Sequence, residues 1–144
     1  MSVQQKKARE AALWALYGMD VTGQLVPKAA EGFYPISSDL DDELTEVWHD
    51  VEARVHGVVE ELPRIDDEVQ RVSPRWRLER MAVIDRNILR LGAWELFNRQ
   101  TPAIVVINAC VELAKEYGEQ NTPGFVNGLL DQICKDHGIQ ISSE

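Results

Sequence analysis

The sequence is poor in the residues that most often carry catalysis or hold metal ions. Its 144 residues include three histidines and two cysteines, and the histidines are not spaced as a zinc-ligand set. Cys110 and Cys134 sit at apolar helical positions, which favours buried free thiols over a disulfide or a metal site. Phosphate-binding glycine loops, zinc-protease motifs and nucleophile elbows are missing from the sequence. These absences predict a protein that is not an enzyme and needs neither a metal nor a cofactor.

Long hydrophobic runs are missing as well. No stretch of about 18 apolar residues occurs, so a transmembrane helix is not expected. The N-terminus lacks the apolar segment of a signal peptide. The sequence therefore predicts a cytoplasmic protein without membrane contact. Its 144 residues, 44% of them hydrophobic, suit a single domain spanning 1–144 with a buried core.

Positive charge is scarce, since 15 lysines and arginines face 24 acids and leave a net charge of −9. The deficit is uneven along the chain. Residues 31–68 hold thirteen acids against two arginines, a net charge of −11, whereas residues 69–99 hold seven arginines against three acids, a net charge of +4. The total charge disfavours nonspecific nucleic-acid binding, but the distribution leaves room for a local basic patch.

Helical periodicity is the pattern that the chain has in abundance. Apolar residues recur at helical spacing, and no segment alternates convincingly as a strand. The pattern predicts an all-α bundle of about six or seven helices. Helices are expected over residues 4–20, 40–62, 64–72, 74–99, 102–118 and 123–136. Residues 22–40, rich in glycine, proline and serine, predict a loop that is either a variable insertion or partly mobile.

Three of these helices are expected to begin at a hydroxyl residue followed by proline. A serine or threonine N-cap accepts a hydrogen bond from an unpaired helical N–H, and proline in the first turn loses no hydrogen bond. The 74–99 helix is expected to break near residues 80–82. The hydroxyl–proline pairs are Ser73-Pro74, Thr101-Pro102 and Thr122-Pro123.

Two groups of cations suggest contact with a polyanion. Lys6, Lys7 and Arg9 cluster at the start of the first helix, where cations oppose the helix dipole, so an anionic partner such as phosphate explains them better than helix stability does. Arg75 and Arg77 flank Trp76, and aromatic rings among arginines suit unstacked bases. A core position for Trp76 is the equally weighted alternative.

Four segments together match a known pattern. They are Lys6-Lys7-Ala8-Arg9-Glu10-Ala11-Ala12-Leu13-Trp14-Ala15-Leu16-Tyr17, Asp85-Arg86-Asn87-Ile88-Leu89-Arg90-Leu91, Val106 to Gly118, and Phe125-Val126-Asn127-Gly128-Leu129-Leu130-Asp131. In this order, and over a chain of this length, they resemble the NusB family of bacterial transcription antitermination factors. Residues 22–62 diverge more from the family pattern.

The resemblance implies an all-helical RNA-binding protein without catalytic activity. Members of this family bind the single-stranded boxA element of nascent ribosomal RNA leader transcripts. They act together with the ribosomal small-subunit protein NusE, in a complex with RNA polymerase that suppresses termination. The family includes monomers and dimers, so a homodimer is one expected state.

The resemblance also assigns roles to residues. Lys6, Lys7 and Arg9 match the family's basic opening that meets RNA phosphates, and Tyr17 and Phe125 match aromatic positions near the RNA. Asp85 matches an acidic position that faces NusE, with Glu79 as a weaker candidate for partner binding.

Three expectations concern the last helix. Asn121 stands where relatives often carry an acid, which suggests that it contacts RNA. Phe125 keeps helical spacing with Leu129, so a core position is the alternative to a base contact. Gly128, inside a helix at a cost of about 1 kcal/mol, is expected to allow close helix packing.

The alternative to an RNA-binding factor is a helical protein-interaction module with weak or lost RNA binding. The −11 charge of residues 31–68 motivates it. RNA titrations separate the two interpretations, because phosphate contacts make binding depend on salt.

Overall fold

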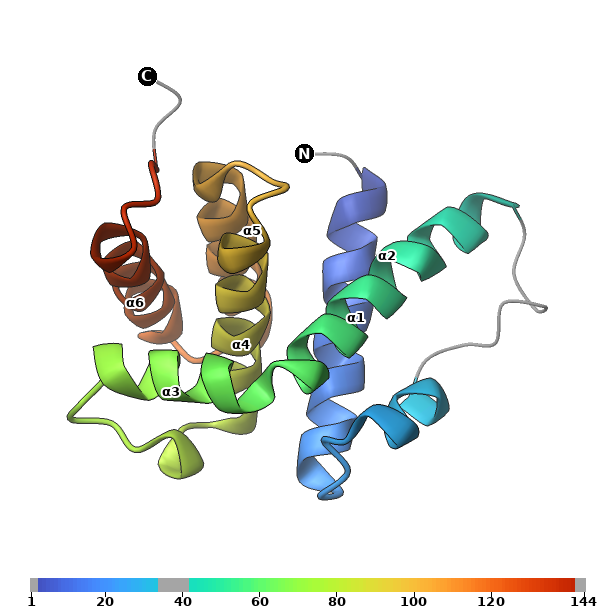
Figure 1. Cartoon of the computed structure of the whole chain (residues 1–144), viewed down its shortest axis with the longest axis horizontal. Helices are drawn as coiled ribbons and strands as arrows, with labels where there is room; N and C mark the ends of the chain where they lie inside the picture. Colours follow the sequence, from blue (N-terminus) through green and yellow to red (C-terminus); the bar gives the residue numbers. More distant parts are fainter. Residues whose placement is uncertain (1–2, 34–41, 142–144) are drawn as a thin grey trace. The chain divides into compact units, whose positions relative to one another are not determined.

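The computed structural model describes residues 3–33 and 42–141. Within them the chain is helical and contains no strand, which confirms the all-α prediction (Figure 1). The chain divides into two compact units, Met1–Glu61 and Leu62–Glu144. The single-domain organisation of residues 1–144 therefore stays a prediction. None of the described helices is both long and apolar enough to cross a membrane.

The first unit is built on two long helices, α1 (Val3–Val21) and α2 (Asp42–Glu60), which pack against each other (Figure 1). Leu13 and Leu16 of α1 and Val55 and Val58 of α2 are fully buried, as the apolar stripes of both helices predict. The predicted start of the second helix, at about Leu40, lies outside the described residues.

The expected 22–40 loop contains a short 3-10 helix, η1 (Pro27–Phe33). It packs against α1 at Gly18, where an added Cβ would lie 2.9 Å from Cδ1 of Phe33. This part of the segment is thus docked on the first helix. The rest of the predicted loop, residues 34–40, lies outside the described residues.

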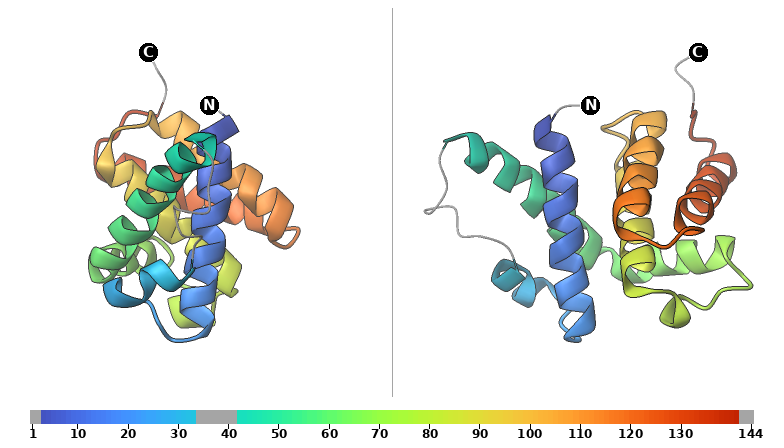
Figure 2. Two further views of the ribbon diagram at one scale, coloured as in Figure 1. Left: turned by 90° about the vertical axis from the view of Figure 1, so that its right-hand side faces the viewer. Right: turned by 180° about the vertical axis from the view of Figure 1, so that it is seen from behind.

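The second unit packs three helices around α4 (Val83–Asn98), namely α3 (Leu62–Val72), α5 (Ala103–Tyr117) and α6 (Thr122–Asp136). α3 runs across α4 and α6, and not along them (Figures 1 and 2). Ile88, Leu89, Leu91 and Ala93 are fully buried on different sides of α4. α4 is therefore the central helix of this unit.

A close approach between helices occurs at Gly92, not at Gly128. A Cβ added to Gly92 would lie 2.8 Å from Cδ1 of Leu130 and 3.0 Å from Sγ of Cys110, whereas a Cβ added to Gly128 would meet nothing within 4 Å. The prediction that Gly128 allows close packing is wrong, because this glycine faces solvent. α6 does continue through Asn127-Gly128 without a turn, as expected. Cys110 and Cys134 are buried free thiols, also as expected.

Two of the three predicted helix starts at hydroxyl–proline pairs are confirmed to within one residue, since α5 begins at Ala103 and α6 at Thr122, but the start at Pro74 and the capping roles are wrong. Residues 74–76 form a turn in which the Trp76 N–H donates to the Ser73 carbonyl at 3.0 Å, and the Ser73 hydroxyl donates back to the carbonyl of Val69 at 2.7 Å, so it caps no following helix. Thr101 is not a cap: Pro102 is extended, precedes α5, and accepts the Val105 and Val106 N–H groups. The expected break near residues 80–82 is present, since the short 3-10 helix η3 (Leu78–Arg80) ends just before α4.

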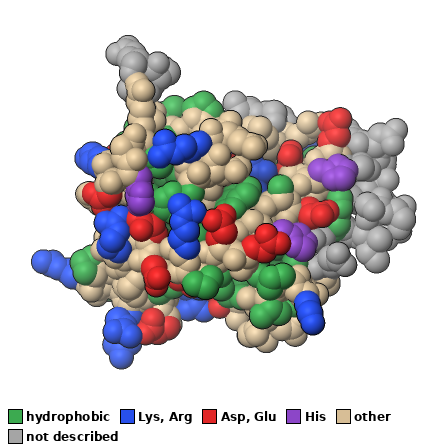
Figure 3. All heavy atoms as spheres, in the orientation of Figure 1, with side chains coloured by type: hydrophobic (Ala, Val, Ile, Leu, Met, Phe, Trp, Pro, Cys, Tyr) green, Lys and Arg blue, Asp and Glu red, His purple; other side chains and the backbone are tan. Residues whose placement is uncertain are grey.

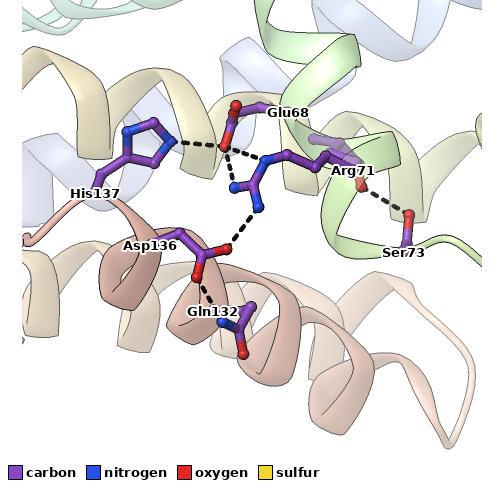
Figure 4. A network of polar contacts seen from close by, with 7 residues as sticks. Glu68, Arg71, Ser73, Gln132, Asp136 and His137 are labelled. Atoms are coloured by element: carbon purple, nitrogen blue, oxygen red, sulfur yellow. Dashed lines mark hydrogen bonds and ion pairs between the residues drawn. The ribbon is translucent and has the colours of Figure 1, made fainter.

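A polar cluster ties the C-terminal end of α6 to α3 (Figure 4). Arg71 bonds Glu68 within α3 and reaches Asp136 of α6, with Nη1 to Oδ2 at 2.6 Å. Nε2 of His137 lies 2.7 Å from Oε1 of Glu68. Gln132 donates to the other carboxylate oxygen of Asp136 at 2.8 Å. Arg71 therefore holds the pKa values of both Glu68 and Asp136 below their usual range.

Candidate nucleic-acid and partner interface

The second unit has a surface hollow of about 320 Å³ beside the start of α6. Its wall combines two aromatic rings, apolar side chains, two acids and one cation. Four of the residues predicted as site residues, or weighed as such, come from three separate segments of the sequence and meet here: Trp76, Asp85, Asn121 and Phe125. The lining residues are Trp76, Arg80, Met81, Ala82, Asp85, Glu119, Asn121, Thr122 and Phe125.

Gln70 of α3 holds the segment that carries Trp76. Its side-chain amide donates to the carbonyls of Ser73, at 3.0 Å, and Trp76, at 2.9 Å, and its Oε1 accepts the N–H of Leu78 at 2.9 Å. Leu78 is buried and anchors the far end of the same segment. Sequence reasoning missed Gln70, since a glutamine on a charged helix gives no signal of the loop that it will bind.

The aromatic pair of the hollow is formed by Trp76 and Phe125. Their ring centroids lie 6.5 Å apart and the planes meet at 82°, an edge-to-face arrangement. Trp76 is 63% exposed, so the core alternative for this residue is wrong. Phe125 is half-buried and lines the hollow. A partly buried ring at the edge of the hollow is compatible both with a role in the core and with contact to a base.

Asp85 lies in the first turn of α4 and lines the hollow. The Thr122 hydroxyl is 3.2 Å from Oδ1 and 3.3 Å from Oδ2 of Asp85, and it accepts the N–H of Glu119 at 3.0 Å. Thr122 thus joins the turn before α6 to α4, and does not cap a helix as the sequence predicted. Burial raises the pKa of the Asp85 carboxyl, and the nearby charge of Glu119 adds to this, against the opposing Thr122 hydrogen bond.

The arginines before α4 differ in their surroundings. Arg75 is exposed, and Arg80 borders the hollow. Arg77 forms an ion pair with Glu79, Nη2 to Oε1 at 2.8 Å, with both side chains largely exposed. Backbone hydrogen bonding, together with Arg77, lowers the pKa of Glu79. The predicted RNA contact Arg77 and the predicted partner contact Glu79 therefore contact each other.

The other four predicted site residues lie on α1, in the first unit. Lys6 and Lys7 are exposed, and Tyr17 is half-buried. Arg9 is only 1% exposed, so the prediction that it forms one surface cluster with the two lysines is wrong. The cause is helical geometry: Arg9 lies three and four residues before Ala12 and Leu13, both fully buried, and shares their face.

Charge on the molecular surface is mixed. On the face shown in Figure 3, basic and acidic side chains are interspersed over the part that α3 and α6 occupy. No group of three or more histidine, cysteine or acidic side chains within residues 3–33 and 42–141 could hold a metal ion. The hollow itself is distinguished by its aromatic pair and its two acids, a combination that suits a binding surface.

Comparison with known proteins identifies the family. The model of the NusB family matches residues 6–135. The transcription antitermination protein NusB of Anaeromyxobacter sp. (strain Fw109-5) is 41% identical over 134 residues, which cover 93% of this chain and 92% of the relative. The protein of the same name from Sorangium cellulosum (strain So ce56) is 41% identical over 137 residues, 90% of this chain and 91% of the relative.

Solved structures agree with these relatives. The structure of T. maritima NusB matches with a TM-score of 0.80 at 33% identity and covers 94% of both chains. A crystal structure of the antitermination factors NusB and NusE in complex with dsRNA matches with a TM-score of 0.80 at 26% identity, over 94% of this chain and 99% of that one. Both sequence and fold thus place the chain in one group: it belongs to the NusB family.

Proposed function

We propose that this protein is a noncatalytic, cytoplasmic transcription antitermination factor. It binds boxA-type single-stranded RNA of nascent ribosomal transcripts together with NusE, within a complex with RNA polymerase. The relatives that carry the name transcription antitermination protein and the solved assembly of NusB, NusE and RNA support this proposal. Family membership leaves both a monomer and a homodimer open as the working state.

The observation that carries the RNA part of the proposal is the aromatic pair of the hollow. Trp76 presents an exposed ring beside Phe125, with Asn121 at the same rim. Unstacked bases bind to such rings, because every base has an apolar face, and nearby cations take the phosphates. Arg75 and Arg80 are two cations on this part of the unit, and the Asn121 amide can read a base edge.

The acids of the hollow support a protein partner next to the RNA. Asp85 and Glu119 border the same hollow as Phe125 and Asn121, and a carboxylate repels phosphate. We infer that the RNA runs along the aromatic rim while a basic segment of NusE faces the acids, with Glu79 at its edge. RNA and partner then adjoin, so each is expected to strengthen the binding of the other.

A titration with boxA-type RNA and with a scrambled RNA of equal length, each with and without NusE, tests the proposal. We expect preference for the boxA sequence, tighter binding with NusE, and a log–log salt slope of roughly −2 to −4, as a few single-strand phosphate contacts give. Equal, weak binding of both RNAs under all conditions would contradict it.

The second candidate is a helical protein-interaction module with weak or lost RNA binding. Three observations favour it. The hollow carries two acids, Arg77, one of the expected RNA-facing cations, is paired with Glu79, and the net charge of the chain is −9. This candidate predicts that the protein binds NusE but shows no measurable preference for boxA RNA. The same titration therefore distinguishes the two candidate functions.

A further inference from the structure

A second aromatic pair lies on α1. The ring of Trp14 meets that of Tyr17 edge to face, with centroids 5.8 Å apart and planes at 70°. Trp14 is 49% exposed, and Tyr17 is half-buried. The resemblance assigns a place near RNA to Tyr17 alone, whereas Trp14 has no assigned role. We infer that Trp14, held by Tyr17, is a further base-stacking residue for single-stranded RNA, an inference that rests on the proposed function.

The core of the first unit covers only part of this ring. Leu13, Ala15 and Leu16, which flank Trp14 in sequence, are buried to 1% exposure or less, so the face of α1 that packs inward is already filled. A tryptophan that leaves half its surface in water forgoes much of the stabilisation that burial gives. The contact with Tyr17 fixes the orientation of the ring. A preorganised ring costs less entropy when a base stacks on it.

Charge on the same stripe of α1 indicates an anionic partner. Lys7 precedes Trp14 by seven residues, two helical turns or roughly 10 Å along the axis, and it is exposed, as is its neighbour Lys6. Glu10 lies between Lys7 and Trp14 on this side of the helix and is partly buried. Its carboxylate repels phosphate, which directs the backbone of a strand to the first turn while a base reaches the ring. A neutral apolar partner would gain nothing from the two lysines.

Substitutions of Trp14 test the inference. Trp14→Gln removes the aromatic face and keeps a good helix former, and Trp14→Phe keeps a smaller face. Val21→Gln is the matched control, because Val21 is an exposed apolar residue in the last turn of the same helix, 54% exposed. Affinity for fluorescein-labelled boxA-type RNA is measured by anisotropy between 50 and 300 mM salt, and folding by thermal melting.

Trp14→Gln should weaken RNA binding by about 5- to 150-fold, the range for loss of one stacked base, with an unchanged salt slope because no phosphate contact is lost. Trp14→Phe should recover most of the affinity, and Val21→Gln should bind as the unmodified protein does. Lys7→Gln, in contrast, should flatten the salt slope by about 0.7. RNA with 5-iodouracil in the boxA sequence should crosslink to the Trp14–Tyr17 segment on irradiation.

Three outcomes would overturn the inference. Trp14→Gln could bind RNA as tightly as the unmodified protein, which defeats the inference and leaves the proposed function intact. It could lose NusE binding or self-association while RNA affinity stays the same, which would assign the ring to a protein partner. If the unmodified protein itself shows no boxA preference, the proposed function fails first. If Trp14→Gln has a lowered thermal midpoint, the RNA affinity of Trp14→Phe and the crosslink to the Trp14–Tyr17 segment test the inference in its place.

Discussion

The ring of Trp76 lies edge-on to the ring of Phe125, with centroids 6.5 Å apart, although the two residues are 49 positions apart in sequence. Gln70 sets the backbone of one partner and the first turn of α6 sets the other. The pair is therefore built by two independent local structures, and each ring can be removed without unfolding the other's support.

Replacing either ring should separate binding from stability. Trp76→Ala is expected to weaken boxA binding by about 5- to 150-fold with a thermal midpoint close to that of the unmodified protein, because Trp76 is mostly exposed. Phe125→Ala should weaken binding similarly and also lower the midpoint, since half of its ring is buried. Anisotropy titrations and melting curves measure both effects. Ile104→Ala, at an apolar residue of α5 that is 38% exposed, is the control and should leave RNA binding unchanged.

The Asp85 carboxyl is expected to reduce stability at neutral pH. Its folded pKa is raised above the unfolded value of 3.8, so the native state binds more protons than the unfolded state between the two values, and stability falls as pH rises through that window. Asp85→Asn removes this penalty. At pH 7 the substitution should raise the thermal midpoint by about 1 to 3 °C, a small gain because the group is partly exposed. Near pH 3 the thermal midpoint should not change.

The same variant should bind NusE more weakly, by about tenfold, if Asp85 faces a basic side chain of the partner. Asp67→Asn, on an exposed acid of α3, is the matched control for both measurements. A variant that is neither more stable at pH 7 nor weaker in NusE binding would show that Asp85 has neither role.

Most of the fold followed from apolar periodicity, because buried stripes record which face of each helix meets the core. The burial of α4 on several sides is one example. The position of Arg9 was also readable: its spacing to Ala12 and Leu13 places it on the buried face, yet its sequence neighbours Lys6 and Lys7 suggested a surface cluster.

Helix starts and the hollow were less predictable, because they depend on tertiary partners. The Ser73 and Thr122 hydroxyls each had a local use as a cap, but Val69 and Asp85 offered other hydrogen bonds. Nothing in the sequence shows that Gln70 will hold the Trp76 segment. The family resemblance predicted Asp85 as a contact for NusE and Phe125 as a contact for RNA. Only the fold shows that both residues line one hollow.

Two glycines make a matched test of helix packing. Gly92→Ala should destabilise the protein by about 1 to 3 kcal/mol, because the new methyl group would overlap Leu130, which is fully buried and cannot move without displacing its neighbours. Gly128→Ala should stabilise it by about 0.5 to 1 kcal/mol, since the site is helical and open. Urea unfolding measures both. Equal effects of the two substitutions would contradict the packing described for α4 and α6.

The basic start of α1 should separate into two kinds of residue. Lys6→Gln and Lys7→Gln are expected to leave the thermal midpoint nearly unchanged and to flatten the log–log salt slope of RNA binding by about 0.7 each, because both lysines are exposed. Arg9→Gln should lower the free energy of unfolding by about 1 to 3 kcal/mol or more, since it removes a buried charged group from its partners.

Melting curves and salt titrations of the three single variants make the comparison, with Lys28→Gln as a control on an exposed lysine of η1. If Arg9→Gln keeps the unmodified stability and flattens the salt slope as the lysine variants do, then Arg9 reaches RNA after all, and its burial in the free protein must be released on binding. A fall in stability with an unchanged slope would instead make Arg9 a structural residue of the first unit. Loss of RNA affinity would then follow only from partial unfolding, and should disappear when binding is measured well below the melting temperature of the variant.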